Sequence, residues 1–259
     1  MKKEMYSSEV TLLRDTFRRL LRRHAKTNIV KLLDKTHPSD LALIFRYFND
    51  AEQDSIFSNM LPSEETVKFL YELDESIATR LIERETAERL AEIMQQASSN
   101  EQAFLMGLVS DEFASSVIDL LQAEEQEELE EMMAYPEDSA GILMYTDVFT
   151  LHEETKAREA IYALQDQEDA EMVFYLYTLD DDGRLTGVIS LRDLVTTPSE
   201  TMLKDIMSKN IQAVRAETDQ EEVARIVSQY NFLAVPVVDA SEKLLGIVTV
   251  DSVVDVIRE

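Results

Sequence analysis

Cysteine and long apolar runs are both absent from this chain. Without cysteine, disulfides and thiol chemistry are excluded, and a reducing compartment is favoured. No run of about 18 apolar residues occurs, so the sequence predicts no bilayer-spanning segment, and the N-terminus has no apolar signal core. Only five glycines occur, none in a glycine-rich phosphate loop, and the three histidines lack metal-ligand spacing. The sequence therefore indicates no catalytic site, and we expect a protein that is not an enzyme.

Basic residues are scarce and unevenly placed. The formal net charge is −27, from 25 Lys and Arg against 52 Asp and Glu. Residues 1–35 hold ten basic and four acidic side chains, whereas residues 90–155 hold 16 acids and no Lys or Arg. Such a field attracts cations and repels nucleic acid and anionic lipid, so no nucleic-acid partner is expected. The acidic stretch is either a solubilising surface or a set of carboxylates that face one another and wait for a divalent ion.

The first 134 residues show helical periodicity. Residues 1–35 predict one long basic amphipathic helix, which could lie on a membrane surface, on an acidic partner or on the chain's own acidic neighbours. Residues 36–134 predict short helices joined by tight turns, and residues 123–132 predict a polar helix. Ser99 followed by Gln102 predicts a capping box. Short amphipathic helices of similar length favour a superhelical array.

The C-terminal part of the sequence repeats itself. Residues 187–195, which read GVISLRDLV, return at residues 246–254 as GIVTVDSVV. A β-rich run and a turn precede each copy, at 173–177 and 180–183 in the first and at 234–238 and 239–242 in the second. Each unit therefore reads β–α–β–β–α. Neither copy alone closes a core, so we expect the two to form one paired module.

A break with turn residues separates the two halves. Residues 135–141 read YPEDSAG, and we place the domain boundary there. The expected domains are 1–134, 135–200 and 201–259, and the fold class is α followed by α/β.

The residues of the repeat and the break resemble known families. Each copy resembles a cystathionine-β-synthase (CBS) motif, and two such copies form a tandem CBS module. Residues 135–144, YPEDSAGILM, are similar to the link between helical domain and CBS pair in MgtE-type magnesium transporters. Residues 218–225 and 246–251 are similar to the second CBS motif of that family.

The resemblance implies a regulatory region that senses Mg²⁺ and gates a membrane pore. That pore would follow Glu259, and the chain would lie at the cytoplasmic face of the membrane while being soluble by itself. A homodimer through the CBS motifs is also implied. Six apolar positions could supply its interface or could instead be intrachain core: Val223, Ile226, Val227, Val253, Val254 and Ile257. The alternative function is a free-standing CBS adapter that senses adenine nucleotides and regulates a protein partner.

The resemblance also implies Mg²⁺ ligands in the second CBS motif. Glu221, Asn231 and Asp255 stand at positions that match ligands of the family, and Asp219 and Asp251 lie close to them in sequence. Mg²⁺ prefers oxygen ligands and keeps several waters, so one or two carboxylates per ion make a weak site. Each acid also has a structural interpretation, since Asp219 and Glu221 stand where a helix is expected to begin.

The sequence departs from the family pattern at several of these positions. Asn231 and Ser252 stand where aspartate is usual, and Asn100 and Phe104 align with an acidic pair of the helical domain. Asparagine and serine keep an oxygen but lose the charge. We therefore expect fewer or weaker ions, or sites shifted to nearby acids: Glu101, Asp111 and Glu112.

A CBS pair can also hold ATP or another adenine nucleotide in its central cleft. The usual signature is Ser/Thr-x-x-Asp, which Ser190 to Asp193 keep and which Thr249 to Ser252 do not. Tyr175 or Phe232 could stack on the base, and Arg192 could meet a phosphate. The structural alternative is that Ser190 and Asp193 cap the following helix.

Overall fold

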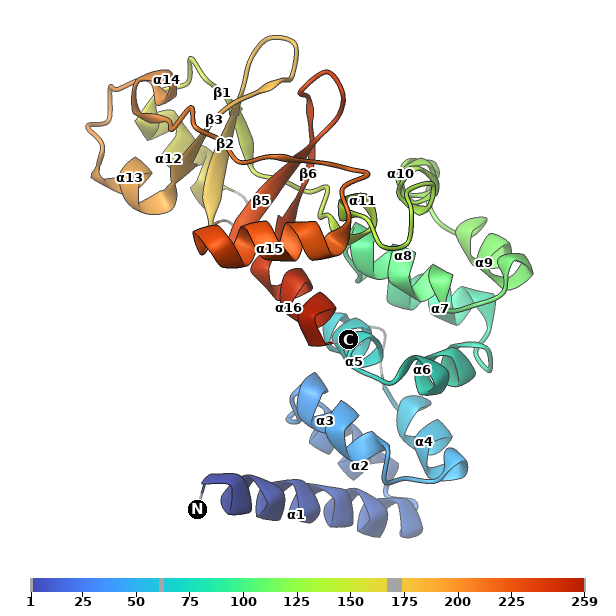
Figure 1. Cartoon of the computed structure of the whole chain (residues 1–259). Helices are drawn as coiled ribbons and strands as arrows, with labels where there is room; N and C mark the ends of the chain where they lie inside the picture. Colours follow the sequence, from blue (N-terminus) through green and yellow to red (C-terminus); the bar gives the residue numbers. More distant parts are fainter. Residues whose placement is uncertain (1, 61–62, 167–173, 259) are drawn as a thin grey trace. The chain divides into compact units, whose positions relative to one another are not determined.

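The chain folds into two compact units, Met1–Leu129 and Glu130–Glu259, in a computed structural model (Figure 1). The structure describes residues 2–60, 63–166 and 174–258, and it describes side chains for 10–60, 63–166 and 174–254. The predicted fold class is confirmed: a set of short helices precedes two small mixed sheets. We describe each unit by itself.

Short helices make up the first unit, and most of them are eight residues long. Their bounds are α1 Lys2–Arg22, α2 Lys26–Leu33, α3 Pro38–Phe45, α4 Asp50–Phe57, α5 Glu64–Tyr71, α6 Glu75–Ile82, α7 Ala87–Met94, α8 Ser99–Gly107, α9 Asp111–Ile118 and α10 Ala123–Met133, of which α10 continues into the second unit. Each helix buries an apolar stripe, and Phe45, Phe69 and Ile82 are fully buried. A short helix is marginal alone, so this shared core stabilises the array.

Polar side chains start these helices. Asn49 and Glu52 form a capping box at α4, and Ser63 and Thr86 accept backbone N–H bonds at the starts of α5 and α7. The capping box predicted at Ser99 and Gln102 is wrong by one residue.

The box lies instead on Ser98 and Glu101. The Ser98 N–H and Oγ both donate to Glu101 Oε2, at 2.9 and 2.8 Å. The Gln102 amide donates backward, to the carbonyls of Met94 and Ala97. The reason is that Gln102 satisfies the carbonyls at the end of α7, so the adjacent acid is left to cap α8.

The single helix predicted over residues 1–35 is two helices. α1 ends at Arg22, and His24 adopts a left-handed conformation with φ of 50°. The Ala25 N–H donates to the Leu20 carbonyl and the His24 N–H to the Leu21 carbonyl, which is the pattern of a Schellman C-cap. A histidine at this position is not a common helix stop, so the break was not visible in the apolar periodicity.

The second unit contains the two repeated copies, and the predicted β–α–β–β–α order is confirmed in each. Its elements are α11 Ala140–Leu143, β1 Thr150–His152, α12 Ala157–Gln165, β2 Tyr175–Leu179, β3 Leu185–Ser190, α13 Leu191–Thr196, α14 Leu203–Ile206, β4 Val214–Arg215, α15 Gln220–Tyr230, β5 Ala234–Val238, β6 Leu244–Thr249 and α16 Val250–Arg258. The predicted first strand is shifted, since β2 begins at Tyr175, and Val173 lies outside the described residues.

Each sheet has three strands, in the orders β1-β2-β3 and β4-β5-β6. The first pair in each sheet is parallel and the second is antiparallel. β5 is buried at every position, which explains its unbroken apolar run.

The two copies complete each other. The segment before β1 pairs with β6, because Tyr145 and Ile247 exchange both backbone hydrogen bonds, at 2.8 and 2.9 Å. The segment before β4 pairs with β3 in the same way, through Ser208 and Val188. A joint core of Tyr177, Ala234 and Ile247 lies between the sheets. This exchange is the structural reason why one copy cannot close a core alone.

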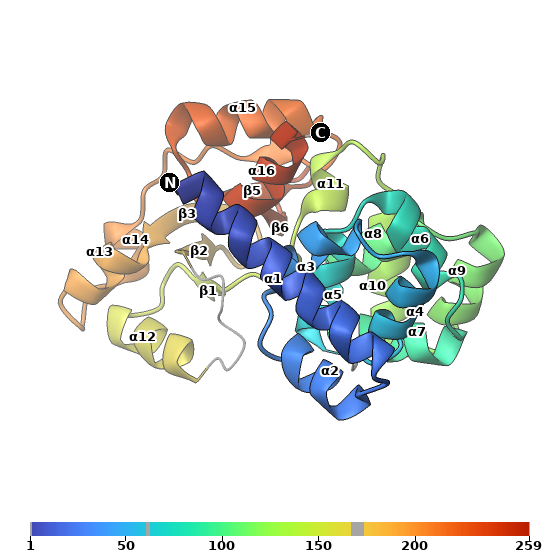
Figure 2. The same cartoon turned by 90° about the horizontal axis from the view of Figure 1, so that it is seen from below.

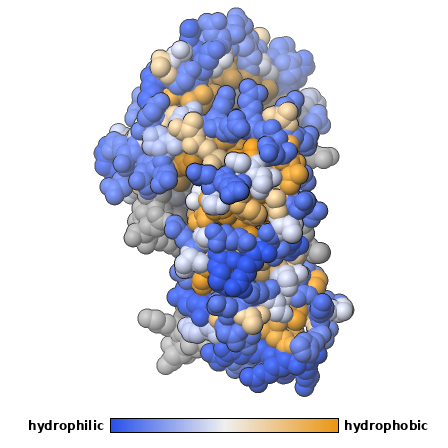
Figure 3. Space-filling view, turned by 90° about the vertical axis from the view of Figure 1, so that its right-hand side faces the viewer, coloured by the Kyte–Doolittle hydropathy of each residue, from blue (hydrophilic) through white to orange (hydrophobic). Residues whose placement is uncertain are grey.

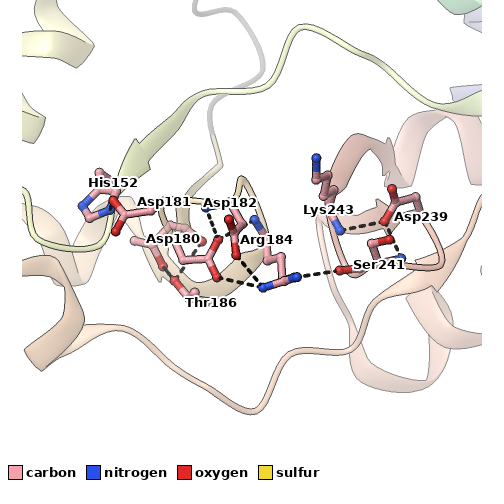
Figure 4. A network of polar contacts seen from close by, with 10 residues as sticks. His152, Asp180, Asp181, Asp182, Arg184, Thr186, Asp239, Ser241 and Lys243 are labelled. Carbon is pink, nitrogen blue, oxygen red and sulfur yellow. Dashed lines mark hydrogen bonds and ion pairs between the residues drawn. The ribbon is translucent and has the colours of Figure 1, made fainter.

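The predicted turns at 180–183 and 239–242 are confirmed, and they touch one another (Figure 4). Asp180 Oδ1 accepts the N–H groups of Asp182 and Arg184, at 2.9 and 2.8 Å. Asp239 holds its own turn through two equivalent bonds. Arg184 Nε then donates to the Ser241 carbonyl at 3.2 Å, so a side chain of the first copy fastens the turn of the second.

On the face drawn in Figure 3, hydrophilic side chains predominate, and the apolar side chains form separate small groups. Within the described residues, no helix has the length and apolar character needed to cross a membrane.

Candidate functional site

The segment 135–141 lies against the start of α15 in the second copy. The N–H groups of Ala140 and Gly141 donate to the carbonyls of Thr218 and Ala216, at 2.7 and 2.8 Å. The Gln220 N–H donates to the Asp138 carbonyl at 2.9 Å. The sequence identified this segment as a break, but only the structure brings it to the helix that carries Glu221.

This contact creates a group of acids, the α15 start group: Asp138, Asp219 and Glu221. Asp219 caps the helix, because its Oδ1 accepts the Glu221 N–H at 2.8 Å. Asp138 accepts a 3.1 Å bond from the Gln220 amide. Glu221 is exposed, and its carboxylate has no hydrogen-bond or ion-pair partner among the described residues. Asp138 is the member that sequence reasoning missed, since it lies some 80 positions away along the chain.

The acidic surroundings of this segment affect the pKa of Tyr135. Partial burial raises the pKa of the Tyr135 hydroxyl, and the carboxylates of Glu131, Glu217 and Asp239 raise it further. These acids come from three separate parts of the unit, so the negative field around the junction is a tertiary property.

Asn231 and Asp251 form a second group, the α15 end group. Asn231 ends α15 in a left-handed conformation, with φ of 54° and ψ of 42°. Val250 N donates to the Leu233 carbonyl at 2.9 Å, which places the start of α16, and thus the exposed Asp251, beside this end. The side chain of Asp255 lies outside the described residues. Asparagine tolerates left-handed backbone better than most residues, which gives its presence here a structural reason.

The two groups are too far apart to share one ion. Glu221 and Asn231 are ten positions apart on one helix, which corresponds to about 15 Å. Mg²⁺ holds its oxygen ligands at about 2.0–2.1 Å, so one chain cannot close a site between them. In the described part of the chain, no cluster of three or more Asp, Glu, His or Cys side chains is placed to hold a metal ion.

Two predicted ligand residues of the helical unit, Asn100 and Glu101, contact other side chains of that unit. Asn100 is buried, and its Oδ1 lies 2.8 Å from Ser98 Oγ. Glu101 is the N3 residue of the α8 capping box. The alternative acids Asp111 and Glu112 lie exposed in the first turn of α9.

The nucleotide candidates of the first copy lie together at one end of its sheet. Tyr175 on β2 pairs directly with Ser190 on β3, just before α13. Ser190 Oγ donates to Asp193 Oδ2 at 2.7 Å and accepts the Asp193 N–H at 3.1 Å, so the capping interpretation is observed. Arg192 is exposed beside them, with no partner among the described residues.

The equivalent positions of the second copy differ. Thr249 is fully buried, and its hydroxyl lies 3.3 Å from Ser252 Oγ at the start of α16. Phe232 stacks on Tyr230, with ring centroids 5.4 Å apart.

Tyr177 is a further residue that sequence reasoning did not single out. It is buried between the two sheets, and its hydroxyl has no hydrogen-bond partner within the described part of the chain. Burial raises the pKa of this hydroxyl well above its usual range. A buried hydroxyl without a partner is costly, so this position is notable.

Three of the six apolar positions considered for an interface belong to the intrachain core. Val223, Val227 and Val253 are buried, whereas Val254 is 38% exposed. The side chain of Ile257 lies outside the described residues. Tyr162 on α12 and Val195 on α13 are more exposed than Val254, with exposed fractions of 63% and 67%.

Two protein families match this chain, and together they cover most of it. Residues 36–138 match the MgtE intracellular N domain, and residues 140–200 and 203–259 each match a CBS domain. The magnesium transporter MgtE of Thermus thermophilus is 34% identical over 241 residues, which is 88% of this chain and 51% of that protein. The chain thus spans about half the length of that curated relative.

Two solved structures share the fold over nearly their whole length. A crystal structure of the soluble part of a magnesium transporter superposes with a TM-score of 0.82 at 26% identity, over 96% of this chain and 98% of that one. The cytosolic domain of the Mg²⁺ channel MgtE, in complex with ATP, superposes with a TM-score of 0.88 at 31% identity, over 94% and 99%.

Proposed function

Because this chain belongs to the MgtE family of magnesium transporters, we propose that it is a cytosolic region that senses Mg²⁺ and thereby gates transport through a membrane pore. The observation that carries this proposal is the α15 start group. Glu221 offers a free carboxylate there, next to Asp138 and Asp219. The role requires binding and movement but no catalysis.

The residues present fit a hard divalent ion that is bound weakly. Carboxylate and amide oxygens are the donors that Mg²⁺ accepts, and Asp138, Glu221, Asn231 and Asp251 supply them at the two ends of α15. When bound, the ion would supply positive charge, and carboxylate oxygens from two surfaces could ligate it together. With one or two free carboxylates at each end, a complete site needs acids from another surface. Weak sites suit a sensor of an abundant ion.

The proposed response follows from charge. Without Mg²⁺, carboxylates on approaching surfaces repel one another, which favours separated surfaces. A bridging ion replaces this repulsion with shared ligation. At a free Mg²⁺ concentration of about ten times the dissociation constant, each site stabilises the closed state, in which the surfaces meet, by about 1.4 kcal/mol. Several such sites together shift the equilibrium from the separated to the closed state, and this change can open or close a connected pore.

A titration with Mg²⁺ tests the proposal by small-angle scattering and thermal melting. Millimolar Mg²⁺ should compact and stabilise the chain more than NaCl of matched ionic strength, and Glu221→Gln should blunt the response. Asp147→Asn is the matched control, because Asp147 is an exposed acid in a loop of the same unit. Asp180 is unsuitable as a control, because its carboxylate holds a turn. Equal responses to Mg²⁺ and NaCl would reject the sensor.

Adenine-nucleotide binding is a second candidate, supported by the unpartnered Tyr177 hydroxyl near Tyr175 and by a similar cytosolic domain that was solved with ATP. The pair Ser190 and Asp193 would exchange its mutual bond for ribose hydroxyls, and Arg192 would meet phosphate. Calorimetry with ATP should show binding that Asp193→Asn abolishes and Asp205→Asn preserves. An unmutated chain that binds no ATP would end this proposal.

The chain would act as a homodimer through its CBS motifs. Tyr162, Val195 and Val254 are exposed apolar side chains on helices of both copies, and they replace the buried valines as interface candidates. Analytical ultracentrifugation at micromolar concentration tests this, and a species of only 29.7 kDa would reject it.

A further inference from the structure

The outer face of α1 is basic, and its orientation is set by the opposite face. Phe17 is fully buried and meets Phe48 edge-on, with ring centroids 6.3 Å apart. The side chains on the other side, Arg19, Arg22 and Arg23, are therefore exposed. Figure 2 shows α1 lying across the outside of its unit. We call these three residues the arginine face.

The arginine face is not neutralised by the chain's own acids. Among the described residues, none of its three guanidinium groups has a carboxylate within ion-pair distance. Most other arginines of the same unit have a carboxylate partner, as Arg80 and Arg84 have in Asp54, whereas the exposed Arg46 has none among the described residues. In a chain with twice as many acids as bases, three adjacent unpaired arginines are an exception that points to an external anion.

Arg18 forms the edge of this face and belongs to the structure of the unit. It donates to the Tyr47 carbonyl at 2.5 Å, and its guanidinium lies 5.7 Å from the centre of the Phe48 ring. Together with Asp15 and the arginine face, it lines a surface hollow of about 420 Å³. The rim is thus held rigid while the three other arginines stay free to bind.

Helix-end electrostatics explain only part of this arrangement. Cations are favoured in the last turn of a helix, which accounts for Arg19 and Arg22, and Arg23 directly follows the end of α1. This helix-end preference does not account for Leu12, which is 70% exposed and lies two turns before Arg19 on the same side of α1. Tyr47 is 51% exposed on another flank of α1, where the Arg14 guanidinium lies 5.8 Å from its ring centre. An exposed apolar side chain beside arginines on one face is typical of a surface that meets a membrane interface.

We propose that the arginine face docks on the phosphates of anionic phospholipid headgroups. Guanidinium groups bind phosphate in two-point geometry, and Leu12 can enter the headgroup layer. A membrane meets one face of a protein, and charges beyond about 8–10 Å are screened, so the acids elsewhere on the chain oppose docking weakly. A nucleic acid or a flexible polyanion would instead follow the surface into those acids. The basic segment lies before residues 36–138, so the matched N domain does not account for it.

Vesicle co-sedimentation tests this proposal in a buffer with EDTA and no Mg²⁺. The chain should bind phosphatidylcholine vesicles that contain phosphatidylglycerol, should not bind phosphatidylcholine alone, and should dissociate at high salt. Each arginine near an anionic surface contributes about five-fold in partitioning, so Arg19→Gln, Arg22→Gln and Arg23→Gln together should weaken binding about 100-fold.

The matched control removes the same charge elsewhere in the first unit, through Lys31→Gln, Lys35→Gln and Arg46→Gln. All three are exposed, and the control should keep most of the binding. Equal losses in both triple variants, or no binding by the unmutated chain, would overturn the proposal. Binding to tripolyphosphate or DNA that matches the vesicle affinity would also overturn it in favour of a soluble polyanion. Because no Mg²⁺ is present, these outcomes are independent of the sensor test.

Discussion

Replacing Gly246 by alanine should weaken the backbone pairing that joins the two CBS motifs and so destabilise the second unit. A Cβ atom at this position would lie 2.5 Å from the Tyr145 carbonyl oxygen and 3.0 Å from Met144 Cγ and Sδ. Tyr145 exchanges two backbone bonds with Ile247, the next residue on β6. The new methyl group can be accommodated only if this backbone moves away.

The expected cost follows from these contacts. Displacing Tyr145 weakens two hydrogen bonds worth about 1 kcal/mol each, and overpacking adds about 1–3 kcal/mol. Removing a glycine from a strand returns about 0.5–1 kcal/mol. The net loss is about 3 kcal/mol, which corresponds to a fall in melting temperature of about 6–12 °C for a unit of this size.

Calorimetric melting with two further glycine variants checks this reasoning. Gly107→Ala has open space around its new methyl group at the end of α8 and should be neutral or slightly stabilising. Gly187→Ala, at the corresponding position of the first copy, would meet Sδ, Cγ and Cβ of Met207 and should also be destabilising, because Cβ cannot move without the backbone. A Gly246→Ala variant that melts with the unmutated chain would refute the close backbone contact between the copies.

Two further predictions concern α15. Asn231→Ala should lower the unfolding free energy by about 1–2 kcal/mol, because alanine disfavours left-handed backbone, while Asn231→Gly should be nearly neutral in the same urea titration; equal losses would contradict the backbone explanation. The hydrogen bond from Arg225 lowers the pKa of Glu222, so Arg225→Gln should return that pKa to the ordinary glutamate range in a carboxyl NMR titration. Since the folded pKa is lowered, the pair stabilises the fold above the ordinary glutamate pKa and loses this effect as pH falls through the lowered value; an unchanged titration would show that Arg225 is not the cause.

Features that depend on neighbouring residues could be predicted from the sequence. The turn acids Asp180 and Asp239, the polar helix 123–132 and the start of α15 at Asp219 and Glu221 were all visible, because each follows from hydrogen bonds spanning a few residues. The repeat itself predicted a paired module, because two similar half-cores need one another. The positions of Ser190 and Asp193 were equally local, and their capping bonds were one of the two stated interpretations.

The tertiary structure alone decided which segments complete which core and which acids meet. Local pattern shows that residues 135–141 form a break, but the bonds from Ala140 and Gly141 to the second copy cross more than 70 positions of chain. The same contact brings Asp138 to Glu221, while the length of α15 keeps Glu221 from Asn231. Side-chain type predicts what a residue can bind. Which donors converge depends on long-range backbone pairing and helix length, and these are properties of the folded chain.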